Sequence, residues 1–197
     1  MENHIVEYHP LQPFLPAHAE LLMLGSFPPP QKRWSMNFYY PNFNNDMWRI
    51  FGVLFFNDKD YFVVNGKKVF NKDKLTDFLI HKGVALYDSA CAVKRLKENA
   101  SDQFLEVVKY TDVIDLLHRL PHCKAIVTTG QKSTDLLRTQ FNVDEPRIGE
   151  SMPLTFGSRT IKLFRMPSSS RAYPLSLDKK ADFYRKMFID LGMYEEF

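Results

Sequence analysis

The chain has 197 residues, of which 45% are hydrophobic and 25% are charged, a balance typical of a globular protein rather than a disordered one. Lys and Arg exceed Asp and Glu by 26 to 23, which is too small an excess to indicate a partner by itself. The length suits a single domain over residues 1–197. We expect a cytoplasmic protein, because no apolar run reaches the roughly 18 residues of a membrane helix and no signal peptide is evident.

Short apolar runs alternate with segments of helical periodicity along the chain. Apolar residues at 47, 50, 51, 54 and 55 share one stripe of a helix. We expect buried strands at 21–24, 84–87, 124–128 and 160–164, and further helices at 73–81, 111–119, 131–140 and 176–191. This alternation predicts an α/β fold, a three-layer α/β/α sandwich with a central, mostly parallel four-stranded sheet.

One segment does not fit this alternation. Residues 61–64 and 67–70 lie on either side of Asn65-Gly66, a dipeptide that suits the type I′ turn of a β-hairpin. We therefore expect a β-hairpin near 61–70, inserted into the sandwich, and the sequence does not indicate its role.

The expected sheet also places the functional site. In open α/β sheets, ligands bind outside the carboxyl ends of the parallel strands. Three segments leave those ends, and they have the most unusual local compositions in the chain: residues 26–44, 88–100 and 165–175. We expect the site to lie among them.

Two segments follow the first predicted strand, and only the second of them indicates binding of nucleobases. Residues 25–29 read Gly-Ser-Phe-Pro-Pro, which matches neither a phosphate-binding loop nor a nucleophile elbow and also suits a plain turn. Residues 38–49 place aromatic rings beside amide side chains where a loop enters a helix. Rings stack on nucleobases and amides read base edges, whereas core packing explains Trp48 better than it explains three nearby asparagines.

The third stretch joins the last strand to the last helix. Residues 166–174 read Met-Pro-Ser-Ser-Ser-Arg-Ala-Tyr-Pro, and hydroxyls near a helix start bind phosphates well, although an ordinary turn fits equally. Residues 159–186 around it carry eight basic residues and two acidic ones, an excess of six. This indicates a surface that faces a polyanion, with a solvated helix face as the alternative.

Metal or covalent chemistry is not indicated. The six histidines show neither HxxxH nor HxH spacing, and the two cysteines cannot form a four-thiolate site, so we expect no metal and no cofactor. Cys91 is interpreted as a small apolar residue. Asp88, at a strand end, is either catalytic or a loop-capping residue.

Taken together, these segments resemble the uracil-DNA glycosylase superfamily, and within it the hypoxanthine-DNA glycosylase branch. That branch has motifs of the forms GSxPG, YYAHPRNxFWRIxG and LPSTSPA, and they correspond to residues 25–29, 39–52 and 166–172 here. The order and spacing of the motifs agree over nearly the whole chain. The resemblance implies the uracil-DNA glycosylase fold, a monomer, and a DNA partner that contains a damaged base, with no membrane and no metal.

The same resemblance implies a monofunctional DNA glycosylase that hydrolyses the N-glycosidic bond of a flipped-out deaminated base, hypoxanthine or uracil. Asn45 corresponds to the catalytic asparagine of the branch, which donates to the leaving base or holds the attacking water. Tyr40 is expected to stack on the base, with Phe27 as a second wall and Gly25 and Ser26 closing the pocket. Contacts to DNA phosphates are expected from Ser168, Ser169, Ser170 and Arg171.

The chain also departs from the pattern of the superfamily. Phe27 stands where the best-known branches carry a catalytic Asn or Asp, and Arg171 stands where the branch has proline. A phenylalanine cannot position a water, so a catalytically silent nucleic-acid-binding module of the same fold is an alternative, and Asn45 argues against it. An enzyme acting on small nucleosides is a third hypothesis, which would not need the basic segment.

Overall fold

The computed structural model describes residues 5–97 and 102–194, and its centre is a five-stranded sheet in the order β3-β2-β6-β8-β7. Four strands are parallel, and they are the four that the sequence predicts: β2 (Leu21–Gly25), β3 (Val84–Asp88), β6 (Ala125–Thr129) and β8 (Arg159–Met166). The fifth strand, β7 (Ser151–Phe156), is antiparallel to β8 and was not predicted.

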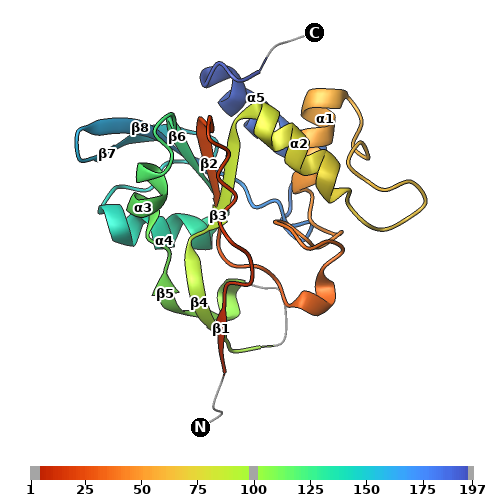
Figure 1. Ribbon diagram of the computed structural model, residues 1–197, viewed down its shortest axis with the longest axis horizontal. Coiled ribbons are helices and arrows are strands. Elements are labelled where there is room, and N and C mark those ends of the chain that lie inside the picture. The colour runs from red at the N-terminus through yellow and green to blue at the C-terminus, as the bar shows by residue number, and fades with distance from the viewer. Residues whose placement is uncertain (1–4, 98–101, 195–197) are drawn as a thin grey trace.

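The parallel strands are continuous apolar runs because helices cover both of their faces. Along β2, Leu21 and Met23 belong to one hydrophobic cluster and Leu22 and Leu24 to the other. Figure 1 shows the two helical layers on opposite sides of the sheet. One layer holds α1 (Met47–Phe56), α2 (Lys72–Lys82) and α5 (Leu177–Asp190), and the other holds α3 (Val113–His118) and α4 (Gln131–Phe141). The predicted three-layer arrangement is confirmed.

A second, antiparallel sheet lies against the carboxyl end of the first. Its strands are β1 (Val6–Tyr8), β4 (Ala90–Arg95) and β5 (Leu105–Tyr110), in the order β1-β4-β5. Because β4 begins two residues after Asp88, the prediction of an open loop over 88–100 is wrong for its described part, and residues 98–100 lie outside the described residues. Two short 3-10 helices, η1 (Gln31–Arg33) and η2 (Asp102–Phe104), complete the elements described here.

Both edges of the five-stranded sheet are protected from further pairing. Along the outer edge of β3, Phe14 and Leu86 exchange two backbone hydrogen bonds of 3.0 and 2.9 Å. At the other edge, β7 carries Pro153, which has no N–H to donate to another strand.

No helix among the described residues is long and apolar enough to cross a membrane.

The loop between α1 and α2 (residues 57–71, hereafter the α1–α2 loop) contains the predicted hairpin in a modified form. A single isolated bridge joins Val63 to Phe70, so neither limb is a strand. The Val64 carbonyl accepts from the Lys67 N–H at 3.0 Å, and Gly66 has a φ of +71° while Asn65 has no positive φ. This is the pattern of a type II turn, which needs a positive φ only at its third residue, so the type I′ prediction is wrong.

Candidate functional site

The carboxyl ends of three neighbouring strands bring a compact group of residues together. Gly25 ends β2, Asp88 ends β3 and Thr129 ends β6, while Tyr40 comes from the loop after β2. The Tyr40 hydroxyl lies 3.0 Å from Oγ1 of Thr129, at hydrogen-bonding distance. A Cβ at position 25 would collide with Oδ1 of Asp88 and would lie 3.6 Å from the Tyr40 hydroxyl. Glycine is therefore required for these groups to approach one another.

Tyr40 is held at this place by its backbone and by its ring. Its φ of +47° is in the left-handed region, an uncommon conformation for a bulky aromatic residue that costs free energy. The ring packs edge-on against Trp48, with centroids 5.7 Å apart, and Trp48 in turn donates to the Tyr39 carbonyl at 3.0 Å. Burial, and then the charge of Asp88, raise the pKa of Tyr40, so its hydroxyl keeps its proton. The structure thus brings together Tyr40 and Gly25, two of the residues that the sequence assigned to a base-binding pocket.

A buried histidine completes this group, and sequence reasoning missed it. His9 follows β1, and its Nε2 lies 2.8 Å from Oδ2 of Asp88. The imidazole ring lies 4.6 Å from the ring of Tyr87 and 5.5 Å, edge-on, from that of Phe27. With one carboxylate oxygen held by His9, the other is directed toward the close approach at Gly25. No local pattern marks a pair that is 79 residues apart in sequence.

Ser26 and Phe27 direct their side chains toward the second sheet. Ser26 is buried and its hydroxyl donates to the Asp102 carboxylate, whose pKa is raised by burial and lowered in part by that bond. Phe27 is 8% exposed, and its ring packs in a small cluster with Ala90, Val93, Leu105 and Leu136. The two side chains therefore pack mainly against residues of the second sheet and α4, although the Phe27 ring also contacts His9.

A second group forms where α1 begins. Asn45 pairs with Ser170 in an isolated backbone bridge, and the Asp46 N–H donates to the Ser169 carbonyl at 2.8 Å. Oδ1 of Asn45 accepts from the Met47 N–H at 2.9 Å, so this side chain caps the helix start. Among the described residues, no protein group accepts a hydrogen bond from Nδ2 of Asn45. The structure thus brings Asn45 beside the predicted DNA-binding residues and leaves its amide nitrogen available.

A buried ion pair lies directly behind this bridge. Lys180 of α5 is fully buried, and its Nζ donates to Oδ2 of Asp46 at 3.0 Å and to the Ser170 carbonyl at 2.8 Å. Nε of Arg171 lies 3.3 Å from the other carboxylate oxygen of Asp46. These contacts fasten the loop after β8 to the start of α1. In the sequence, Lys180 is one of eight basic residues in its segment and has no distinguishing feature.

Other basic residues of 159–186 also have internal partners. Arg159 donates to three backbone carbonyls between α3 and β6, and Lys162 pairs with Asp190 at 2.8 Å. Arg165 pairs with Glu145. The charge excess in this segment is therefore not a single polyanion-facing surface, and Arg171 is the member that lies beside Asn45.

The three serines of the third motif differ in exposure. Ser169 is only 4% exposed, and its backbone carbonyl is used by Asp46, so its hydroxyl does not reach the surface. Ser168 is half-buried and its Oγ accepts from the Ser170 N–H at 3.2 Å, while Ser170 is exposed. Of the three serines that the sequence predicted to contact DNA phosphates, Ser169 is therefore buried, Ser168 is half-buried and Ser170 is exposed.

Metal ligands and activated thiols are not brought together in the described part of the chain. No group of three His, Cys, Asp or Glu side chains there could hold a metal ion. Cys91 and Cys123 are free thiols, and burial raises the pKa of Cys123 to about 11, which makes it a poor nucleophile.

Comparison with known proteins bears on the fold. No protein-family model and no curated protein sequence matches the chain. A solution NMR structure from Methanosarcina acetivorans, described as a "putative Uracil DNA glycosylase", matches with a TM-score of 0.63 over 95% of this chain and 99% of that chain. The chain has the uracil-DNA glycosylase fold. At 20% identity, this likeness concerns the architecture, and the α/β prediction is confirmed at that level.

Proposed function

We propose that the protein is a DNA glycosylase that hydrolyses the N-glycosidic bond of a deaminated base, hypoxanthine or uracil, flipped out of DNA. The observation that carries this proposal is the meeting of three sequence motifs at one end of the parallel sheet. Residues 25–29, 39–52 and 166–172 lie in three separate segments, yet the middle segment contributes Tyr40 to the group at Gly25 and Asn45 to the group at Ser170. The uracil-DNA glycosylase fold supports the same function.

The group around Gly25 has the chemistry of a pocket for a base. Tyr40 is proposed to offer a ring face for stacking, and the missing Cβ of Gly25 lets the Asp88 carboxylate lie beside the strand end and the Tyr40 hydroxyl. The Asp88 carboxylate accepts hydrogen bonds when ionised. Hypoxanthine and uracil present a ring N–H on their pairing edge, whereas adenine and cytosine present a ring acceptor there. An acceptor at Asp88 therefore favours the deaminated base over its parent.

Asn45 is the proposed catalytic residue. Breaking the glycosidic bond builds positive charge on the sugar and negative charge on the departing base, so a donor aimed at the base stabilises the transition state. Because Oδ1 of Asn45 is held by the Met47 N–H, the amide nitrogen is the group that is left to donate to the base. Of the two roles expected for this asparagine, the geometry favours donation to the leaving base over holding a water.

Ser168, Ser170 and Arg171 are proposed to bind the phosphates around the flipped nucleotide. The guanidinium of Arg171 is half-exposed: its Nε contacts Asp46, its Nη1 donates to Oδ1 of Asn44 at 3.4 Å, and no protein group among the described residues accepts from its Nη2. Phosphate contacts of this kind position the strand and contribute affinity without reading sequence. Phe27 is given no contact with DNA, because its ring packs in the cluster with Ala90, Val93, Leu105 and Leu136.

A catalytically silent DNA-binding module is the second candidate, and the environment of Phe27 favours it. The buried ring of Phe27 occupies the motif position from which the best-known branches act, and it cannot hold a water. The two candidates differ in one outcome, since only the enzyme releases a base.

The test is a gel assay on labelled duplexes that contain one hypoxanthine, uracil or xanthine, each followed by hot alkali. Cleavage only after alkali is expected, because base removal leaves an abasic site that alkali breaks. Asn45→Ala is expected to abolish excision while DNA affinity stays close to wild type. Asn45→Ser is the matched variant, since its hydroxyl still caps α1 but the amide donor is gone. Full activity in both variants would remove Asn45 from the mechanism, and wild-type binding without cleavage would favour the silent module.

A further inference from the structure

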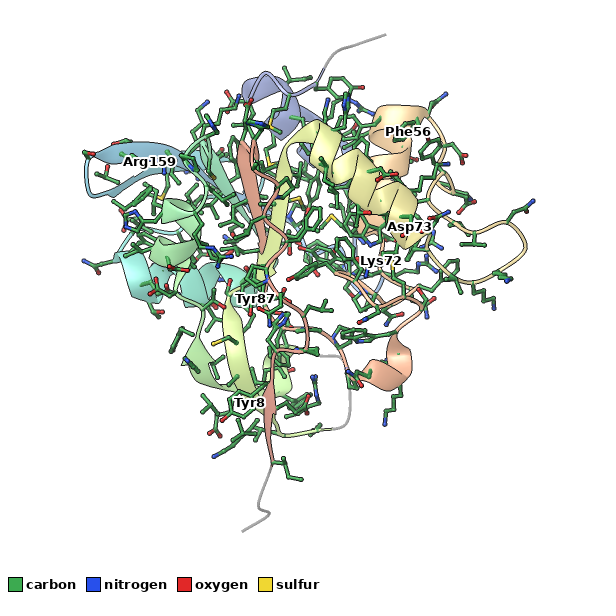
Figure 2. The ribbon with its side chains drawn as sticks, viewed as in Figure 1. Tyr8, Phe56, Lys72, Asp73, Tyr87 and Arg159 are labelled. Carbon is green, nitrogen blue, oxygen red and sulfur yellow. The ribbon has the colours of Figure 1, made fainter. Side chains whose placement is uncertain are left out.

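The α1–α2 loop projects from the body of the protein, but its two limbs are packed against the protein by buried aromatic side chains. At its start, the ring of Phe56 stacks on that of Tyr61 with centroids 3.5 Å apart. Phe62 and Phe70, in the two limbs, are 1% and 2% exposed, and Lys74 donates to the Tyr61 carbonyl at 2.9 Å. Figure 1 shows the loop extending beyond α1 and α2, and Figure 2 shows Phe56 and Lys72 near its two ends. A loop anchored in this way can present its tip at a fixed place.

A cavity of about 530 Å³ lies between the start of this loop and the start of α5. Charged side chains dominate its lining: Asp46, Arg49, Lys59, Asp60 and Arg171. Asp46 and Arg171 also belong to the group around Asn45, so the cavity adjoins the proposed catalytic residue. Ser176, which caps the amino terminus of α5, forms another wall.

The charges around this cavity do not balance. Among the lining residues, three cations (Arg49, Lys59 and Arg171) face two carboxylates (Asp46 and Asp60), which leaves an excess of one positive charge. Behind Asp46 the buried Lys180 adds a positive charge, and Asp178 in the first turn of α5 adds a negative one. Burial lowers the pKa of Arg49, and the positive charge of the neighbouring Arg171 guanidinium lowers it further. The amino terminus of the 14-residue α5 adds a partial positive charge. An anion in the cavity would relieve this imbalance.

The exposed lysines of the loop point to the same kind of ligand. Lys59 is at the cavity, and Lys67 and Lys68 are at the tip; within residues 5–97 and 102–194, none of the three is within ion-pair distance of a carboxylate. Lys72 and Lys74, by contrast, lie over aromatic rings of the protein. The three unpaired lysines therefore have no evident part in holding the fold together.

We propose that the cavity binds a backbone phosphate of the DNA strand next to the flipped nucleotide, and that Lys67 and Lys68 contact phosphates farther along the duplex. This inference rests on the proposed function, because it takes the ligand to be DNA. It assigns the inserted loop the role of a second backbone contact beside Asn45. The lysine contacts contribute affinity and salt dependence and do not read the base.

The test measures binding to a labelled long duplex that contains one abasic-site analogue, by fluorescence anisotropy between about 50 and 200 mM salt. The variants are Lys59→Ala and the double variant Lys67→Ala with Lys68→Ala. The control is Lys124→Ala with Lys186→Ala, which removes the same number of charges as the tip variant at the amino-end side of the sheet, although Lys124, unlike the tip lysines, pairs with Glu20. The salt slope is expected to fall by about one unit for Lys59→Ala and by about two for the tip variant, with affinity weaker by about threefold or more per lost contact.

The outcomes separate this inference from the function on which it rests. Wild-type protein that shows no salt-dependent binding to duplex DNA would overturn both proposals. Salt-dependent binding by wild type, with unchanged slopes in both lysine variants, would overturn only the loop assignment. An equal fall in salt slope and affinity in the control variant would indicate a general charge effect and would also overturn the loop assignment. On a duplex trimmed to about one helical turn, wild type and the tip variant are expected to bind equally, because the tip then has no phosphates to contact.

Discussion

Replacing Lys180 by methionine tests how strongly the site depends on its buried ion pair. The side chain is fully buried, and its loss leaves Asp46 with the half-exposed Arg171 as its remaining cation. Removing one partner of a buried ion pair costs about 3–5 kcal/mol, and because Arg171 remains, we expect the lower end, about 3 kcal/mol. With a urea m value of about 2–3 kcal/mol/M for a chain of this size, the unfolding midpoint is expected to fall by about 1–1.5 M.

The measurement is equilibrium unfolding in urea, with Lys179→Met as the matched control on the exposed face of the same helix. Lys179→Met is expected to stay within about 0.5 kcal/mol of wild type. The double variant Lys180→Met with Asp46→Asn removes both charges and is expected to recover part of the loss. A cost below about 1 kcal/mol for Lys180→Met would refute the reasoning that this pair is desolvated and fastens the third motif to α1.

Three further outcomes follow from the environments of Gly25, Tyr40 and Tyr87. Gly25→Ala places a methyl group against Asp88 and is expected to lower excision and to destabilise the fold by about 1–3 kcal/mol, and a variant with wild-type excision and unfolding curves would contradict the close approach. Tyr40→Phe removes the hydrogen bond to Thr129, with an expected cost of about 1 kcal/mol in urea unfolding; no change would mean that water replaces it. Burial raises the pKa of Tyr87 from 10.0 to about 12, so the folded state holds that proton more tightly than the unfolded state does. Stability is therefore expected to be full below pH 10 and to fall as the pH approaches 12, and an alkaline titration of tyrosinate absorbance that shows normal ionisation in the folded protein would contradict this.

The four parallel strands could be predicted because strands covered on both faces are continuous apolar runs. The strands of the smaller sheet and β7 could not be predicted in the same way. β7 alternates buried and exposed positions around Pro153, a residue that usually argues against a strand, and its place at the sheet edge makes the proline tolerable. β4 was missed because it follows β3 with only Ser89 between them, and no turn signal separates the two strands.

The candidate site was predictable in its local motifs and not in its long-range pairs. Gly25 stands at a strand end and Asn45 just before a helix start, positions that hydrophobic periodicity reveals, and Tyr40 lies in the loop between these two elements. The contacts of Asp88 with His9 and of Asp46 with Lys180 span 79 and 134 residues, and they arise only when separate elements pack together. Burial also separates Ser169 from its neighbours, which the sequence of three consecutive serines could not show.

The two protected edges of the central sheet have a consequence for how the protein behaves at high concentration. An exposed sheet edge is a template on which a second chain can add a strand, and this route leads to aggregates. Here the backbone pairing of Phe14 with Leu86 occupies one edge, and Pro153 interrupts the row of donors on the other. Both edges of the central sheet are therefore protected against the addition of a strand from a second molecule in concentrated solutions. Replacing Pro153 by valine or threonine would restore a donor to β7 and turn that edge into a point of self-assembly.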